Sequence, residues 1–435
     1  MRAHTAPGVL VQNPEMSARV RDLVLAASTV EIIRPYHGVT VHGDMSGDLG
    51  AVYAGDTPRP DLTIVTAAAV LLSAGRQVTV RDENAYAHPV PGDMTPQLRL
   101  LKLQLATWQA DLATVADMRA LEPDIPVVVF GGTVANLPAD AVGDSIVGDA
   151  PSALAGLFDV ADVTLIDGYR LLPMERYRTQ DGTLRAHLQA SRGCDRTCLY
   201  CPYIRTLGRW SKRSLNSFRQ DVEGLRDLGV TEIQFRDQDF ASDTAHAISV
   251  AEVMRDAGRG SIRWSVEGNL DQFTPELLDA MREGGATEAI VGIETVDPAV
   301  LRHARRKVVQ DTAERLEQVV RHGLRARGLF LFGLPEDSWE RARATLDFAL
   351  GLPIHAAQFN VYSPLPGESF GLDRVATVDD FLPLKNDFRY RTCEAMTQKE
   401  VRLAAALAAR IFDADRAGEL STRDRLMSRF AAPRP

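Results

Sequence analysis

The chain has 435 residues, of which 45% are hydrophobic and 25% charged, and its formal net charge is −9. This length exceeds one ordinary hydrophobic core and predicts two or three domains. The acidic excess argues against nucleic acid as a partner and favours a cationic or neutral substrate. No apolar run approaches the roughly eighteen residues of a membrane-spanning helix, and the N-terminus lacks the apolar stretch of a signal peptide. With only four cysteines, we expect a cytoplasmic protein.

Residues 1–160 alternate strand and helix patterns, which predicts an open parallel sheet of the Rossmann type. An apolar run over 8–14 predicts a first strand. Further strands are predicted over 77–82, 100–106, 125–130 and 144–149. Helices are predicted over 62–73 and 108–121. The Gly-rich stretch 38–55 has no assignable pattern.

A polar, irregular linker is expected over 161–182, with turn signals at both ends. Residues 183–372 then repeat a strand and a helix six times. The strands are predicted over 187–191, 231–235, 261–266, 287–293, 328–333 and 356–362. This pattern predicts a partial (β/α)6 barrel whose chemistry sits at the C-terminal strand ends. The tail, 373–435, contains an amphipathic helix over 397–412 that we expect to cover the open barrel.

The first predicted barrel strand is followed by Cys194, Cys198 and Cys201, in the spacing C-x3-C-x2-C. Clustered thiolates select zinc, copper(I) or iron–sulfur centres. A structural zinc site needs four ligands, and no further metal-binding pair follows in the sequence. A [4Fe-4S] cluster held by three cysteines would leave one iron open for a small molecule. The remaining Cys393 is expected to be a buried structural residue.

Acidic residues stand at the ends of the next predicted strands. Asp237 and Asp239 follow the second strand, and Glu267 and Glu294 follow the third and fourth. Because parallel strand ends meet at one edge of a barrel, these carboxylates are expected to converge on the cysteine loop.

The cysteine loop and the strand ends together resemble the radical SAM superfamily, across the whole of 183–372. The resemblance implies that Cys194, Cys198 and Cys201 hold a [4Fe-4S] cluster whose open iron chelates S-adenosylmethionine (SAM). It also implies cofactor contacts from residues that match the superfamily's motifs. Tyr200 would lie near the adenine, Leu331 would flank it, and Ser363 stands at the exit of the last strand.

The same resemblance assigns roles to the acidic residues. One carboxylate after the second strand would accept hydrogen bonds from the ammonium of SAM. Asp237 holds the usual position, but Gln238 displaces the second acid to Asp239, so either can be the acceptor. Glu267 and Glu294 are candidates for the ribose hydroxyls or the methionine end of SAM. No catalytic residue is identified.

The first domain resembles the cobalamin-binding-type domain that precedes some radical SAM domains. The similarity lies in the strand and turn at Gly131-Gly132 and in the step Val147-Gly148-Asp149. The domain lacks an Asp-x-His-x-x-Gly motif, and Trp108 follows a strand end where a corrin would need room. Bound cobalamin and an empty scaffold therefore both remain open.

The superfamily resemblance implies reductive cleavage of SAM and hydrogen abstraction from a natural-product substrate by the 5′-deoxyadenosyl radical. The electron would come from flavodoxin or ferredoxin. A narrower resemblance is to the diol dehydratases of the apramycin type, which dehydrate a sugar of an aminoglycoside and work with a partner reductase. The alternative is a cobalamin-dependent radical SAM C-methyltransferase. A non-catalytic iron–sulfur or zinc protein is the third hypothesis.

Overall fold

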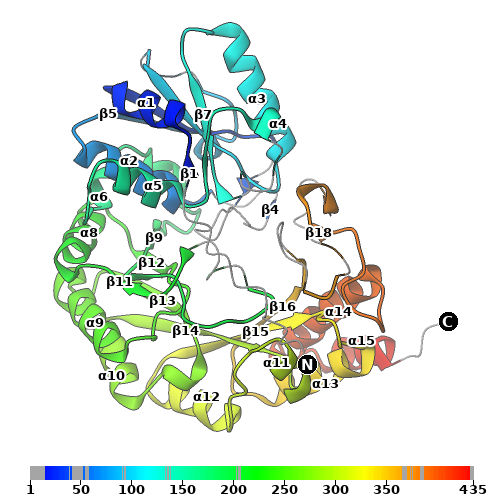
Figure 1. The fold of residues 1–435 in the computed structure, drawn as a ribbon. Coiled ribbons are helices and arrows are strands. Elements are labelled where there is room, and N and C mark those ends of the chain that lie inside the picture. Colours follow the sequence, from blue (N-terminus) through cyan, green and yellow to red (C-terminus); the bar gives the residue numbers. More distant parts are fainter. Residues whose placement is uncertain are drawn as a thin grey trace, which may run out of the picture.

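The computed structural model describes residues 15–431, apart from 39, 42–51, 54–57, 91, 93–94, 133, 135–136, 138, 202, 204–206, 365–369, 373, 375 and 383–386. The strand expected over 8–14 lies outside the described residues, as does most of the stretch 38–55. The described chain forms a smaller α/β unit and a larger partial barrel, with a helical region after the barrel (Figure 1).

The N-terminal sheet has the strand order β5 (Gln77–Asp82), β2 (Thr29–Arg34), β6 (Leu98–Lys102), β7 (Val127–Phe130), β8 (Ser145–Val147) and β1 (Glu15–Met16). All neighbours are parallel except β1, which runs antiparallel to β8. The strand order reverses between β2 and β6. In open α/β sheets such a switch point leaves a crevice at the carboxyl ends of the strands, where ligands bind. The predicted Rossmann-like sheet is confirmed.

Helices cover both faces of this sheet. One face carries α2 (Leu62–Ser73) and α5 (Ala150–Leu157), which pack on each other and lie between the sheet and the barrel (Figure 1). The N-terminus of α2 is capped by Asp61, whose carboxylate accepts from the N–H groups of Thr63 and Ile64. Three further helices are α1 (Ala18–Ala26), α3 (Trp108–Leu121) and α4 (Ala139–Val142).

Trp108 begins α3 and packs against a separate apolar core between β6, β7 and α3. This core includes Leu101, Val115 and Val129. The indole is therefore held by packing within the domain.

The segment expected to be an irregular linker contains a helix, α6 (Ile166–Tyr169), and a 3₁₀ turn at Met174–Tyr177. It packs so closely that a Cβ on Gly168 would lie 2.2 Å from the carbonyl oxygen of Val65 in α2. The hydroxyl of Tyr169 bonds to the backbone of His187 in the first barrel strand. These contacts make the segment part of the core that joins the two units. The apolar residues of the segment recur at helical spacing, which places them on one side of the chain.

The barrel is one parallel sheet whose six strands follow chain order. The strands are β9 (Arg185–Leu188), β12 (Glu232–Phe235), β13 (Arg263–Gly268), β14 (Ala286–Glu294), β15 (Arg325–Phe332) and β16 (Ala356–Val361). The helices between and after them are α8 (Leu215–Asp227), α9 (Thr244–Gly258), α10 (Pro275–Glu283), α11 (Pro298–His303), α12 (Thr312–Arg321) and α13 (Trp339–Gly351). The predicted partial (β/α)6 barrel is confirmed.

Both open edges of the barrel are covered. The β9 edge contacts the α6 segment, as described above. The β16 edge packs against α14 (Gln398–Arg416), which also contacts α13 and α15 (Leu420–Ala431). The helical C-terminal region therefore packs against the β16 side of the barrel, as expected.

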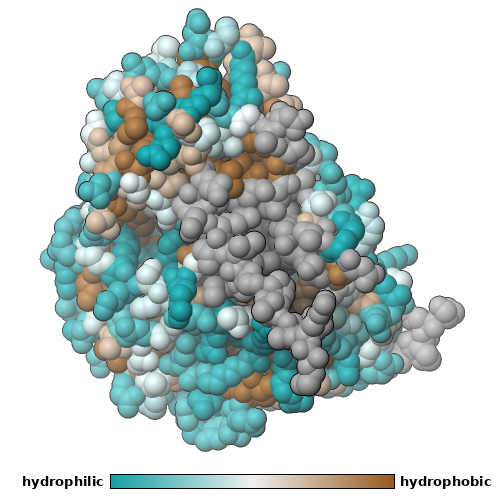
Figure 2. Space-filling model, viewed as in Figure 1, coloured by the Kyte–Doolittle hydropathy of each residue, from teal (hydrophilic) through white to brown (hydrophobic). Residues whose placement is uncertain are grey.

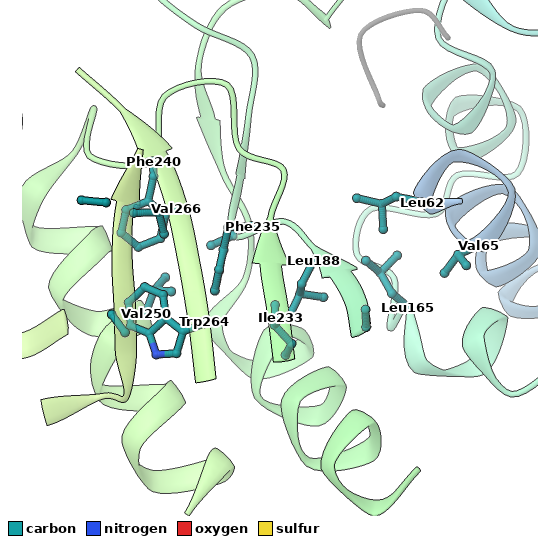
Figure 3. Close-up of a cluster of buried hydrophobic side chains, with 14 of the residues drawn as sticks. Leu62, Val65, Leu165, Leu188, Ile233, Phe235, Phe240, Val250, Trp264 and Val266 are labelled. Atoms are coloured by element: carbon teal, nitrogen blue, oxygen red, sulfur yellow. The ribbon is translucent and has the colours of Figure 1, made fainter. Parts of the chain in front are cut away.

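One apolar core runs through both units. Figure 3 shows it passing from Leu62 and Val65 in α2, through Leu165, to Leu188 in β9 and Trp264 in β13. Hydrophilic side chains cover most of the barrel helices on the face seen in Figure 2. Among the described residues, no helix combines the length and apolarity needed to cross a membrane.

A buried group of charges lies at the carboxyl ends of β2, β5 and β6. Lys102 donates to Asp61 (Nζ to Oδ2, 2.5 Å), and Arg34 donates to Asp82 (NH1 to Oδ2, 3.1 Å). These four side chains are at most 1% exposed. The Tyr177 hydroxyl, from the segment between the two units, donates to the same Asp82 oxygen at 2.7 Å. The two cations balance the two anions, so the network can be stable without solvent.

Candidate radical SAM site

The stem of the cysteine loop is a short hairpin. Strand β10 (Ser191–Arg192) pairs with β11 (Ser211–Lys212), and the N–H of Cys194 donates to the carbonyl of Gly208 at 3.2 Å. Gly193 has φ +80°, and a Cβ there would lie 2.4 Å from the Arg209 carbonyl oxygen. Only glycine meets both demands. The stem therefore fixes where the loop leaves the barrel.

The thiols of the loop lie at its inner side. Cys194 and Cys198 are each 8% exposed, and Cys201 is half-buried. The N–H of Arg196 donates to the Cys194 sulfur at 3.4 Å, and the N–H of Cys201 donates to the Cys198 carbonyl at 3.2 Å. Burial raises the pKa of the Cys194 thiol to about 11 and also raises that of Cys201. Iron binding must therefore displace protons from these thiols at neutral pH.

The donor set suits a cluster better than a single metal ion. Cys194, Cys198 and Cys201 are free thiols on one loop with a fixed stem, and thiolates are the ligands of iron–sulfur clusters. A structural zinc site takes four ligands, whereas three cysteines leave one iron of a [4Fe-4S] cluster without a protein ligand.

Asp237 fixes the stem of the loop. Its carboxylate accepts from the N–H groups of Ala190 (3.2 Å) and Ser191 (2.6 Å) and from the Ser191 hydroxyl (2.5 Å). Burial raises the pKa of Asp237 to about 7, although these hydrogen bonds act in the opposite direction. Its acceptor positions are thus occupied by the protein.

Asp239 bonds to the side chains of Asn269 and Gln272, and in the described parts of the chain one of its two carboxylate oxygens has no partner at ordinary hydrogen-bond geometry. Its Oδ2 accepts from Gln272 Nε2 at 3.2 Å and lies 3.9 Å from Arg196 Nε. Its Oδ1 is buried and has no hydrogen-bond partner among the described residues. Burial raises the pKa of Asp239. The negative charge of Asp239 in turn contributes to the raised pKa of the Cys194 thiol. An unsatisfied buried carboxylate oxygen beside the cysteine loop is costly unless a ligand completes it.

Glu294 belongs to a second group of charges beside the loop. It has φ +68°, and its Oε1 lies 3.8 Å from Arg306 NH2. The Tyr200 hydroxyl bonds to it, and burial raises its pKa, while Arg306 lowers it. Arg306 also donates to the Gly292 carbonyl at 2.8 Å and bonds to the Cys198 sulfur. Sequence reasoning missed Arg306, because its contact with Cys198 joins distant parts of the chain.

The structure also brings Tyr200 and Leu331 together. Both pack around a small apolar core of Val300, Leu334 and Tyr362. Ser363 directly follows Tyr362 and is half-buried. Glu267 lies at the end of β13, where its carbonyl accepts from the N–H of Phe240 at 3.3 Å. The expected cofactor residues thus all lie at the C-terminal side of the barrel.

A pocket of about 400 Å³ opens beside this region, between β14, α12 and α13. Gly292, Arg306 and Phe348 are among its lining residues. The cysteines and the seven expected SAM residues do not line it, and Arg306 and Gly292 stand between this pocket and the cysteine loop's charge group.

The N-terminal sheet meets the cysteine loop through an ion pair. Arg192, at the stem of the loop, pairs with Asp149, which follows β8 and begins α5. The β8 end of the sheet's carboxyl edge is therefore placed against the loop. This contact joins residues far apart in sequence and had no local signal.

Polar groups also lie after β2 and β6, the two strands between which the order of that sheet reverses. His37, after β2, lies 2.8 Å from Asp111 (Nε2 to Oδ1), and Asp111 Oδ2 accepts from the N–H of Gln104 at 2.9 Å. Gln104 is fully buried, yet neither polar atom of its side-chain amide has a hydrogen-bond partner in the described part of the chain.

Comparison with known proteins identifies the class. Residues 188–349 match the radical SAM superfamily. The chain therefore contains a radical SAM domain, and the cofactors of this class are a [4Fe-4S] cluster and SAM. The match covers the cysteine loop and the strand ends through β15.

The chain is 30% identical over 241 residues to an uncharacterised methyltransferase of Pyrococcus horikoshii, which covers 55% of this chain and 52% of that protein. It is 29% identical over 189 residues to the ribosomal protein uS12 methylthiotransferase of Heliobacterium modesticaldum, covering 41% of each. The chain thus spans about half the length or less of these relatives.

Among solved structures, the chain is similar to the methyltransferase TsrM of Kitasatospora setae with cobalamin and a [4Fe-4S] cluster bound. The TM-score is 0.60 at 16% identity, covering 78% of this chain and 74% of that one. It is also similar to OxsB with aqua-cobalamin bound, with a TM-score of 0.55 at 15% identity over 76% of this chain and 54% of that one. At these identities the likeness shows a shared fold, which includes the N-terminal unit.

Proposed function

We propose that the chain is a cobalamin-dependent radical SAM methyltransferase that acts on a small-molecule natural product. When bound, the cluster and SAM supply a 5′-deoxyadenosyl radical, and cobalamin supplies the methyl group. The observation that carries this proposal is the ion pair between Asp149 and Arg192, which joins the β8 end of the sheet's carboxyl edge to the stem of the cysteine loop. In open α/β sheets ligands bind at the carboxyl edge. The relatives described above are named as methyl- and methylthiotransferases, and they lend no support to the dehydration of an aminoglycoside that the narrower sequence resemblance favoured.

The geometry supports Asp239 as the carboxylate that binds the ammonium of SAM. Its unpartnered Oδ1 can accept a charge-assisted hydrogen bond. Asp237 would act indirectly, by positioning the loop. Tyr200 and Leu331 offer apolar surface for the adenine. Glu267, Glu294 and Ser363 stay proposed contacts to the rest of SAM.

Asp239→Asn is expected to weaken SAM binding by about tenfold or more, because a charged hydrogen bond contributes roughly 1.5–3 kcal/mol. Asp237→Asn should instead lower cluster content, because the Asn amide cannot accept from all three donors of the loop stem. Iron content and SAM affinity, measured on both reconstituted variants, separate the two roles. Equal SAM affinity for Asp239→Asn and the wild type would contradict this assignment.

The segments that follow β2 and β6 contain groups that suit cobalamin. The side chains around a corrin end in amides, which both donate and accept hydrogen bonds. The buried Gln104 amide can pair with such a group, and His37 presents an imidazole held by Asp111. A polar ligand that forms hydrogen bonds with the unpaired Gln104 amide would remove the cost of burying that amide without partners, which favours binding there.

Gln104→Leu is therefore expected to weaken cobalamin binding by about tenfold while leaving the melting temperature unchanged or raising it. An unpaired buried amide destabilises the fold, so an apolar side chain of similar size costs nothing there. Equilibrium binding of cobalamin and thermal unfolding of the apoprotein measure the two effects. A variant that binds cobalamin as the wild type does would show that Gln104 does not face the cofactor.

The proposed reaction is tested by cofactor content and product mass together. Anaerobic protein should bind cobalamin tightly, and incubation with SAM, a reductant and a candidate substrate should add one CH2 to the product. Protein that takes up no cobalamin and forms a product lighter by one water would overturn the proposal and restore dehydration of a sugar diol. An aminoglycoside is a suitable first substrate, since the net charge of −9 favours a cation.

A further inference from the structure

A basic surface lies next to the cysteine loop. It begins at the end of α11 and continues through residues 302–307, which read Arg-His-Ala-Arg-Arg-Lys. The backbone of this run touches the loop directly, because the N–H of Leu199 donates to the carbonyl of Ala304 at 2.9 Å. Leu199 stands between Cys198 and Cys201, so this surface lies close to where the cluster would be held.

Two cations of this surface are not balanced by the protein. Lys307 donates to Asp271 (Nζ to Oδ2, 2.5 Å), and Arg306 is directed at Gly292 and Glu294. Arg302 and Arg305 are exposed, and in the described part of the chain neither has an ion-pair partner. They give a local positive field on a chain whose net charge is −9.

We propose that Arg302 and Arg305 form the docking surface for an acidic one-electron carrier protein of the flavodoxin type. This inference rests on the proposed function, because it requires a cluster in the cysteine loop. Electron-transfer complexes are small and transient, and charge complementarity sets their association rate. A positive surface attracts a negatively charged carrier, and the rest of the acidic protein repels it. The carrier is therefore guided to this one surface.

The test compares the Arg302→Glu/Arg305→Glu variant with the wild type as reconstituted holoenzymes. Reduced flavodoxin is mixed with each in the absence of SAM, and bleaching of the cluster absorbance gives the rate of reduction. At low ionic strength we expect the variant to be reduced by flavodoxin about tenfold or more slowly. Added salt should slow the wild type until the difference closes, because it screens the attraction. Dithionite, a small inorganic anion that needs no docking surface, should show a much smaller difference between the two proteins.

The matched control is Arg21→Glu/Arg410→Glu, which changes the net charge equally at exposed arginines on α1 and α14. It should be reduced by flavodoxin nearly as fast as the wild type. Equal flavodoxin rates for the wild type and Arg302→Glu/Arg305→Glu would overturn the proposal and mark these arginines as an ordinary solvated surface. An equal loss in the control variant would also overturn it, because net charge would then explain the effect. This experiment measures reduction of the cluster and not methyl transfer. A failure of the proposed methyl transfer would therefore appear in the product analysis and not in these rates.

Discussion

Replacing Cys194, Cys198 and Cys201 together by alanine is expected to abolish both the cluster absorbance and the cleavage of SAM. Each thiolate would bind a different iron, and without them no soft ligand set is left on the loop. SAM would then have no open iron to bind and no source of an electron. Iron analysis, visible absorbance and detection of 5′-deoxyadenosine on anaerobically reconstituted protein measure the loss.

Cys393→Ala is the matched control for this prediction. Cys393 is the only other cysteine of the chain, and it is 4% exposed and packed in the apolar core. The substitution should cost some stability but leave iron content and SAM cleavage intact. A triple variant that keeps its iron would show that the cluster is held elsewhere and would contradict the site. If the wild type contained zinc and did not cleave SAM, the chain would be a non-catalytic metal protein.

Lys102→Met is expected to destabilise the protein by about 3–5 kcal/mol, because it leaves a buried carboxylate without its cation. Among the described residues, Lys102 and Arg34 form ion pairs with Asp61, whose side chain is 1% exposed. In the double variant Asp61→Asn/Lys102→Met, the pair Arg34 and Asp82 is still balanced. The Asn also retains the helix cap of α2. Denaturant unfolding should therefore show the double variant to be more stable than Lys102→Met alone. Additive losses would contradict a coupled network.

The same network predicts the response to acid. Lys102 and Arg34 overcome the effect of burial and lower the pKa of Asp61 to about 2, below its usual 3.8. A carboxyl with a depressed pKa in the folded state stabilises above its unfolded pKa, and this contribution is lost as the pH falls through the folded value. The wild type should thus lose about 2 kcal/mol between about pH 4 and pH 2 from this group. Asp61→Asn should have a smaller loss over that range.

The regular elements of the fold were largely predictable from the sequence. The predicted bounds of α2 and α3 agree with the structure at both ends, because long helices carry a repeated pattern. Strand β2 was missed although it lies inside the sheet, between β5 and β6, since Glu31 and Arg34 interrupt its apolar residues. Both charges are buried and paired with side chains from other strands. A buried ion pair cannot be recognised from one of its partners.

The candidate site was predictable only where one short stretch determines it. The spacing of Cys194, Cys198 and Cys201 identified the loop. Spacing could not separate Asp237 from Asp239, because the difference depends on which of them meets the backbone of Ser191. The contacts of Arg306 with Cys198 and of Arg192 with Asp149 join distant parts of the chain, so they had no sequence signal.

The most direct test of the central claim is the formation of 5′-deoxyadenosine from SAM by the anaerobically reconstituted wild type with dithionite. The cysteine loop, the unpartnered Asp239 oxygen and the apolar group at Tyr200 predict 5′-deoxyadenosine and methionine in equal amounts, dependent on the cluster. Protein with a full, reducible cluster that leaves SAM uncleaved would contradict radical chemistry at this site.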